Sequence, residues 1–291
     1  MLTMTVVPIL GAGSSMADYR IGFKWWALII AVVFVISELV CVACVPERPV
    51  ACDEKPGKIS DMFKALFKND QAMTVVVSII LVYTSLNICG NLVLYFFRFD
   101  VGNEGAYSIF AAVAFAAQVL VMMVIPLLRK RFSKSQLFIS GFIIQIAGFA
   151  VILIMAFAKL YTPQSWYILC LPGILIYLGY GMLNVIMTIF LSDSVDYGEV
   201  MNGTREESVI FSMQTFTVKL ASGVAVFLAG LVVDWIHLDT AAAVQTQDTL
   251  DALRMWMTIP SVILLIVGIF VFKRFYKLDD TRMEEIKSKL N

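Results

Sequence analysis

The sequence predicts an all-α integral membrane protein. Hydrophobic residues make up 60% of the 291 residues and charged residues only 15%, whereas soluble domains are about half apolar and about a quarter charged. The apolar residues also form long uninterrupted runs, and a helix needs about 20 such residues to cross a bilayer. Composition and run length together argue against an ordinary soluble domain.

Seven apolar runs are long enough to be full transmembrane helices. They cover residues 22–44, 72–97, 106–128, 137–158, 167–191, 208–233 and 255–275. Residues 1–13 form an eighth apolar run that is too short to cross. No basic segment precedes this run and no convincing cleavage site follows it, so we interpret it as the end of a further helix rather than as a signal peptide. We expect about seven full spans and one incomplete span.

The polar stretches between the spans divide the chain into four parts. They are residues 1–44, a polar middle loop at 45–71, a six-helix part at 72–276 and a charged tail at 277–291. Within the middle loop, residues 59–67 place apolar side chains at amphipathic helical spacing. Sixteen Lys and Arg residues lie at the middle loop, the tail and the loops on the same side, and five lie on the other side: Arg20, Lys24, Arg98, Lys159 and Arg254. Because cytoplasmic loops carry the excess of Lys and Arg, we expect a multi-pass protein of the plasma (inner) membrane with a cytoplasmic carboxy terminus.

Charge, cysteine and histidine contents argue against several other classes of protein. The net charge is zero, so nothing attracts the chain generally to nucleic acid. The five cysteines form no disulfide framework, and the single histidine, His237, is not accompanied by carboxylates at metal-ligand spacing. No pairing of nucleophile and base is apparent. We therefore expect no enzyme activity, no cofactor and no metal site.

One lysine, Lys219, lies in the middle of an apolar run. Ser208, Ser212, Thr215, Lys219 and Ser222 follow at steps of 4, 3, 4 and 3, which places them on one helical face. A charge at that depth costs at least about 2.5–3.5 kcal/mol and usually faces a bundle interior or an aqueous cavity. Packing between helices needs no ammonium group, so we interpret this face as functional.

Three other spans carry polar or small residues at helical spacing. Such residues also serve interhelical packing, and we expect packing to be the role of the stripe around Gln145. The stripes are Tyr83, Asn87 and Asn91; Gly141, Gln145 and Gly148; and Gly173, Tyr177, Tyr180, Asn184 and Thr188.

An acidic loop is expected between the spans 167–191 and 208–233. Its carboxylates, Asp193, Asp196 and Glu199, taken alone are typical of solvated charge. Thr204 and Glu207 have capping-box spacing, which predicts that the next helix starts there.

This loop and the helix after it resemble the glycoside–pentoside–hexuronide:cation symporters, the melibiose-permease branch of the major facilitator superfamily. The family pattern is Asp-x-x-Asp-Tyr-Gly-Glu, then Thr-Gly-x-Arg-x-Glu, then a helix with Ser-x-x-Thr and a lysine. The matching residues are Asp193, Asp196, Tyr197, Gly198, Glu199, Gly203, Arg205, Glu206, Ser212, Thr215 and Lys219. Residues 7–9, 20–23 and 46–47 are similar to the end of helix V and to helix VI, so the resemblance covers nearly the whole chain. Asn202 and Glu207 depart from the pattern.

The resemblance implies a partial major facilitator fold, without helices I–IV and part of V. It implies sugar uptake coupled to Na⁺, Li⁺ or H⁺ by alternating access, with the cation ligands in the missing amino-terminal half. The residues that it places at the substrate or in coupling are Lys219, Thr215 and Val218. From the polar stripes we add Ser212, Asn184 and Tyr177 as further candidates for substrate binding or coupling. Those that it places in a cytoplasmic gate are Asp193, Asp196, Tyr197, Gly198, Glu199, Arg205 and Glu206.

Two functional hypotheses follow. The first is a truncated sugar:cation symporter. The alternative is a non-transporting membrane remnant, or a regulatory or binding half that pairs with another half-transporter. The expected partners are membrane lipid, a small sugar or glycoside and a monovalent cation, but no nucleic acid, and the full-length protein is expected to be a monomer.

Overall fold

The computed structural model describes residues 10, 16–44, 67–203, 207–240, 242 and 244–290. The chain divides into two units, Met1–Gly57 and Lys58–Asn291, and each is described by itself. Nearly all of the incomplete span at the amino terminus, most of the middle loop with its amphipathic segment, and the capping residue Thr204 lie outside the described residues.

Among the described residues of the first unit, α2 (Met16–Cys44) is the membrane-length helix. Its side chains are exposed along most of its length and are mainly apolar, as expected for a helix surrounded by lipid or by other membrane helices. Its 29 residues give a length of about 43 Å, more than the ~30 Å hydrocarbon layer requires. The helix predicted at residues 22–44 is present.

In the part of the second unit that the structure describes, six membrane-length helices form a bundle and one short helix follows them. Its elements are α4 (Asp70–Tyr95), η1 (Phe96–Asp100), α5 (Ala106–Leu128), α6 (Lys134–Phe157), η2 (Trp166–Leu169), α7 (Cys170–Asn202), α8 (Glu207–Trp235), α9 (Gln247–Phe275) and α10 (Asp280–Leu290). Together with α2, seven helices among the described residues are long and apolar enough to cross a membrane, the number that the sequence predicts.

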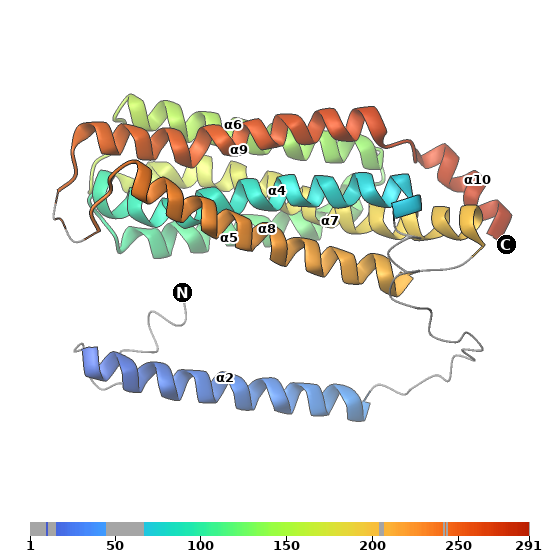
Figure 1. The fold of residues 1–291 in the computed structure, drawn as a ribbon, viewed down its shortest axis with the longest axis horizontal. Coiled ribbons are helices and arrows are strands. Elements are labelled where there is room, and N and C mark those ends of the chain that lie inside the picture. The colour runs from blue at the N-terminus through green and yellow to red at the C-terminus, as the bar shows by residue number, and fades with distance from the viewer. Residues whose placement is uncertain are drawn as a thin grey trace. The chain divides into compact units, whose positions relative to one another are not determined.

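Helices α4 and α7 contact each other and connect the other members of the bundle. Helix α4 also packs against α8 and α9, and α7 packs against α5 and α6, while α6 and α9 pack against each other. Figure 1 shows α6 and α9 side by side along one edge of the bundle, with α10 continuing beyond α9. We call the end of the bundle that bears α10 the α10 end, and the end that bears Asp100, Phe157 and Trp235 the far end.

Small residues bring α6 and α7 into backbone contact. A Cβ atom on Gly179 would lie 2.6 Å from both the backbone nitrogen of Gln145 and the backbone oxygen of Gly141. A Cβ on Gly148 would lie 2.7 Å from the backbone nitrogen of Ile176. Only glycine leaves room for this approach, and close approach through small residues is a common way for membrane helices to associate. The stripe around Gln145 serves packing, as the sequence predicts.

Two helix boundaries correct the sequence analysis. The segment Asp193–Glu199, expected to be a loop, is helical, because α7 continues to Asn202 and ends at Gly203, whose φ of 74° is left-handed. Polarity ends a hydrophobic run there, but nothing before Gly203 interrupts the helical hydrogen bonds. Helix α9 begins at Gln247 rather than at 255, capped by Thr246, whose side chain accepts a hydrogen bond from the Thr249 backbone.

The far end of α4 widens into a π-helical turn, η1. The Val101 nitrogen donates to the Phe96 oxygen at 3.0 Å, a step of five residues. This turn lets the consecutive side chains Phe96 and Phe97 both be fully buried, and it brings Asp100 to the inside of the bundle.

We expect Gly179→Ala to destabilise the bundle by about 1–3 kcal/mol, the usual cost of overpacking, because the added methyl group meets backbone atoms of α6. The matched control is Gly223→Ala in α8, where a Cβ meets nothing within 4 Å and alanine improves helix propensity by about 0.8–1.0 kcal/mol. Thermal unfolding of the purified protein in detergent measures both. Equal unfolding temperatures for the two variants would contradict this account of the α6–α7 contact.

Candidate functional site

The polar face predicted on α8 is exposed at the surface of the second unit. Ser212, Thr215 and Lys219 are all exposed, whereas the alanines on the other side of α8 are buried. Among the described residues, the Lys219 ammonium group has no hydrogen-bond or ion-pair partner. In a membrane such a group needs water or a counter-charge. Val218 differs from its neighbours, since it is half-buried and packs against the core.

The polar stripes of α4 and α7 meet in the bundle. The Asn184 side-chain amide donates a hydrogen bond to the Tyr83 hydroxyl at 2.6 Å. The Tyr83 and Tyr180 rings meet edge to face, with centroids 5.5 Å apart, and Tyr177 lies 6.4 Å from Tyr180 in the same way. The structure thus places Asn184 and Tyr177, two predicted substrate residues, in one cluster with a tyrosine from α4.

Two sets of contacts extend this cluster. Along α4, the amide of Asn87 donates to the Tyr83 backbone oxygen and the amide of Asn91 to that of Asn87, each at 2.7 Å. Between helices, the Gln214 amide of α8 donates to the Thr188 hydroxyl of α7 at 3.5 Å. Helices α4, α7 and α8 therefore each contribute polar side chains to this part of the unit.

A buried ion pair lies at the α10 end of the bundle. The carboxylate of Asp193, a predicted gate residue on α7, pairs with the ammonium group of Lys134 on α6, and both side chains are less than a tenth exposed. Lys134 also lies 3.4 Å from Asp280 of α10, which in turn lies 3.3 Å from Arg129. Burial raises the pKa of the Asp280 carboxyl, but Arg129 and Lys134 more than reverse this effect, so that its pKa lies below the ordinary value.

The other predicted gate residues occupy the last turns of α7. Gly198 packs against Asn69: a Cβ atom on Gly198 would lie 2.8 Å from the side-chain nitrogen of Asn69. The same nitrogen donates a hydrogen bond to the Ser194 backbone oxygen at 2.8 Å. Tyr197 packs against the apolar side of α10. Asp196 and Glu199 are half-buried on the same turns. The remaining two predicted gate residues, Arg205 and Glu206, lie outside the described residues.

A second buried ion pair, at the far end, was not anticipated from the sequence. Arg254 of α9 binds Asp100 through two nitrogens, at 2.8 and 2.5 Å, and each side chain is only 3% exposed. The Tyr161 hydroxyl donates to the same carboxylate at 2.6 Å, and Asp251 binds Arg254 at 2.6 Å. Burial, together with the hydrogen bond to Asp100, raises the pKa of Tyr161. Arg254 was expected in a loop but lies in α9. The signal in the sequence that could have indicated a buried arginine is its position directly before the apolar run 255–275.

Comparison with known proteins identifies similar sequences over nearly the whole chain. The family described as "MFS/sugar transport protein" matches residues 1–280. The raffinose carrier protein of Pediococcus pentosaceus is 23% identical over 99% of this chain and 45% of its own length. The isoprimeverose transporter of Lactiplantibacillus pentosus is 25% identical over 96% of this chain and 56% of its own length. The lactose permease of Lactobacillus helveticus is 22% identical over 92% of this chain and 42% of its own length. The chain spans about half the length of these relatives.

We expect Arg254→Leu to destabilise the second unit by about 3–5 kcal/mol, since it leaves the Asp100 carboxylate buried without its counter-charge. The control is Arg98→Leu, which removes an exposed pair with Glu104 at 3.8 Å and should cost less than about 1 kcal/mol. The double variant Asp100→Leu with Arg254→Leu should recover much of the loss, because no fully buried charge is left unpaired and the Asp251 side chain, which also loses its partner, is 38% exposed. Thermal unfolding in detergent separates the three. Equal losses for Arg254→Leu and Arg98→Leu would contradict the assignment.

Proposed function

Because the chain belongs to the MFS/sugar transport protein family, we propose that it forms the carboxy-terminal part of a secondary transporter that moves a sugar or glycoside together with Na⁺, Li⁺ or H⁺. The observation that carries this proposal is the exposed polar face of α8, where Lys219 has no partner among the described residues. Substrate sites of secondary transporters lie near the membrane midplane, between the two repeats. Lys219 also lies near the middle of its membrane-length helix, twelve residues after Glu207, the first residue of α8.

The side chains of the polar cluster formed by α4 and α7 suit a sugar. Tyrosine hydroxyls and asparagine amides both donate and accept hydrogen bonds, as the hydroxyl groups of a sugar require, and aromatic rings offer a flat apolar surface. Tyr83, Tyr177 and Asn184 supply these groups from α4 and α7. The relatives are named for raffinose, isoprimeverose and lactose, which supports a sugar or glycoside as the substrate class.

Coupling follows from competition for the same carboxylates. The Lys219 ammonium group requires a counter-charge inside the membrane, and we place that charge in the amino-terminal part of the whole transporter, where the coupling cation also binds. Each of the two cations then changes the free energy of binding of the other. In the same proposal the α10 end is cytoplasmic, and the pair Lys134–Asp193 belongs to the gate there.

The alternative is a membrane protein that binds a ligand or another half-transporter but does not itself transport. The observation behind this alternative is that the chain matches only about half the length of its relatives. Proteoliposomes that contain only this polypeptide distinguish the two. We expect no sodium-driven uptake of lactose or raffinose by the chain alone, and uptake by the complete transporter that contains this stretch. Failure of the complete transporter to take up any sugar of a broad panel would favour the alternative.

In the complete transporter, Lys219→Ala should abolish cation-driven sugar accumulation. Lys219→Arg should not restore it, because the planar guanidinium group has a different geometry and binding pattern. The control is Lys130→Ala, which removes an exposed lysine just beyond α5. Radiolabelled sugar uptake into vesicles measures all three, and normal accumulation by Lys219→Ala would refute the coupling role.

Asp193→Asn should change the rate of transport rather than sugar affinity, because the Lys134–Asp193 pair lies at the α10 end. A loss of about 1.4 kcal/mol in the closed gate shifts its opening equilibrium about tenfold. Lys134→Gln should have the same effect, and the double variant should not add the two losses, since both residues belong to one interaction. The Michaelis constant and turnover for sugar uptake test this. A large loss of affinity at normal turnover would contradict the gate assignment.

A further inference from the structure

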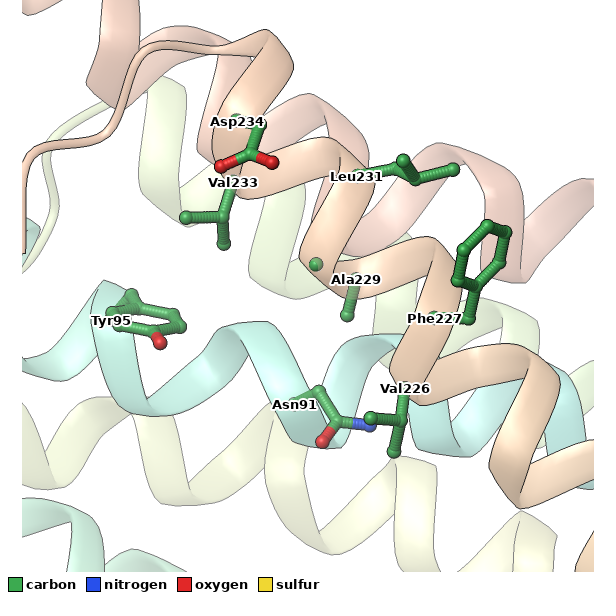
Figure 2. A pocket seen from close by; sticks show the side chains of 9 residues that line it. Asn91, Tyr95, Val226, Phe227, Ala229, Leu231, Val233 and Asp234 are labelled. Carbon is green, nitrogen blue, oxygen red and sulfur yellow. The ribbon is translucent and has the colours of Figure 1, made fainter.

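A pocket of about 550 Å³ lies between α4 and α8, toward the far end of the bundle. Its volume is within the range of about 300–1,000 Å³ that is usual for small-molecule sites. Figure 2 shows Asn91 and Tyr95 of α4 facing the segment of α8 that carries Val226, Ala229 and Asp234. Phe227 and Leu231 of the same segment point away from α4 (Figure 2).

This pocket continues both polar stripes of the candidate site. On α4, Tyr83, Asn87, Asn91 and Tyr95 follow at steps of four residues. On α8, the face of Lys219 continues toward the far end through Ser222 and Val226 to Gly230 and Asp234. Gly230 is eleven residues from Lys219, which corresponds to about 16 Å along a helix. The pocket is therefore a place distinct from the level of Lys219.

Three oxygen-bearing side chains from two helices give the pocket its chemistry. The Asn91 amide nitrogen is engaged by the Asn87 backbone oxygen at 2.7 Å, which leaves its carbonyl oxygen as an acceptor. The Asp234 carboxylate is an acceptor with no hydrogen-bond partner among the described side chains. The Tyr95 ring is held by stacking on Phe99, at 6.5 Å and 7°, and adds a hydroxyl group and an aromatic edge.

We propose that this pocket is a second sugar-binding site, occupied by the transported sugar before or after it reaches the level of Lys219. Neighbouring hydroxyl groups of a sugar donate hydrogen bonds to a carboxylate and to an amide oxygen, and the apolar ring face packs on Tyr95 and Val226. Three oxygen-bearing side chains spread over a volume of this size suit a sugar better than a bare cation, which needs its ligands at about 2–2.6 Å. The identity of the ligand rests on the proposed function.

A direct consequence can be tested on this polypeptide. All residues that line the pocket belong to α4 and α8, so the chain should bind sugar without any other protein. The experiment is saturation-transfer difference NMR of lactose, raffinose and free monosaccharides with the full chain in lipid nanodiscs. We expect saturable binding in the millimolar range, which corresponds to about −4 kcal/mol.

Two variants remove the site in different ways. Asp234→Asn keeps the shape and removes the charge, and it should weaken binding at least about tenfold, the effect of losing about 1.4 kcal/mol. Gly230→Leu fills the pocket and should abolish binding; a Cβ there meets nothing within 4 Å, so the bundle should fold normally, which size-exclusion chromatography verifies. The matched control, Asp248→Asn, removes an exposed carboxylate at the start of α9, on the same end of the bundle, and should leave binding unchanged.

Several outcomes would overturn the proposal. It fails if the chain shows no saturable sugar binding, or if Asp234→Asn and Gly230→Leu both bind as the unmodified chain does. Neither result affects the proposed function, which is decided by sugar uptake in the complete transporter. Conversely, sugar binding that both variants abolish would support the pocket even if the complete transporter moved no sugar.

Discussion

The constraint on which this structure depends is that a charged group cannot stay unpaired in hydrocarbon. Each isolated charge there costs at least about 2.5–3.5 kcal/mol, so a charge that remains must have a partner or water. In the second unit two charged clusters obey this rule inside the protein, Lys134 with Asp193 at the α10 end and Arg254 with Asp100 at the far end. The exposed ammonium group of Lys219 has no partner among the described residues, so it obeys the rule only through water or through a counter-charge from outside them. This difference distinguishes the charges that are paired within the bundle from Lys219, to which we assign the coupling role.

The two buried pairs also determine which helices are held together. Lys134–Asp193 joins α6 to α7, and Arg254–Asp100 joins α9 to the π-helical end of α4. Between these ends, glycines bring α6 and α7 into backbone contact. One ion pair therefore joins α6 to α7 at the α10 end and the other joins α9 to α4 at the far end, with close packing of α6 on α7 between the two ends. Helix α8 packs on α4 of this framework and keeps its polar face exposed.

Part of this arrangement is predictable from the sequence because simple physical rules determine it. Hydrocarbon thickness sets the length of a span, so all seven described spans were found, and helical periodicity placed Ser212, Thr215 and Lys219 on one face. The end of α7 was wrong because hydropathy records where polarity begins, whereas the helix ends only where Gly203 takes a left-handed φ. The Arg254–Asp100 pair joins residues 154 positions apart, and no local pattern indicates which carboxylate an isolated arginine will meet. Tertiary pairing of this kind needs the fold.

Helix α8 shows how one helix can serve two environments. Ala221, Ala225 and Ala229 recur every four residues on its buried side, which lets it approach α4 closely without large interlocking side chains. Beside the alanines, Ser212, Thr215 and Lys219 lie exposed toward the middle of the helix, and toward the far end Gly230 and Asp234 line the pocket shared with α4. Packing thus uses the smallest side chains of the helix, and its polar chemistry remains on the exposed face.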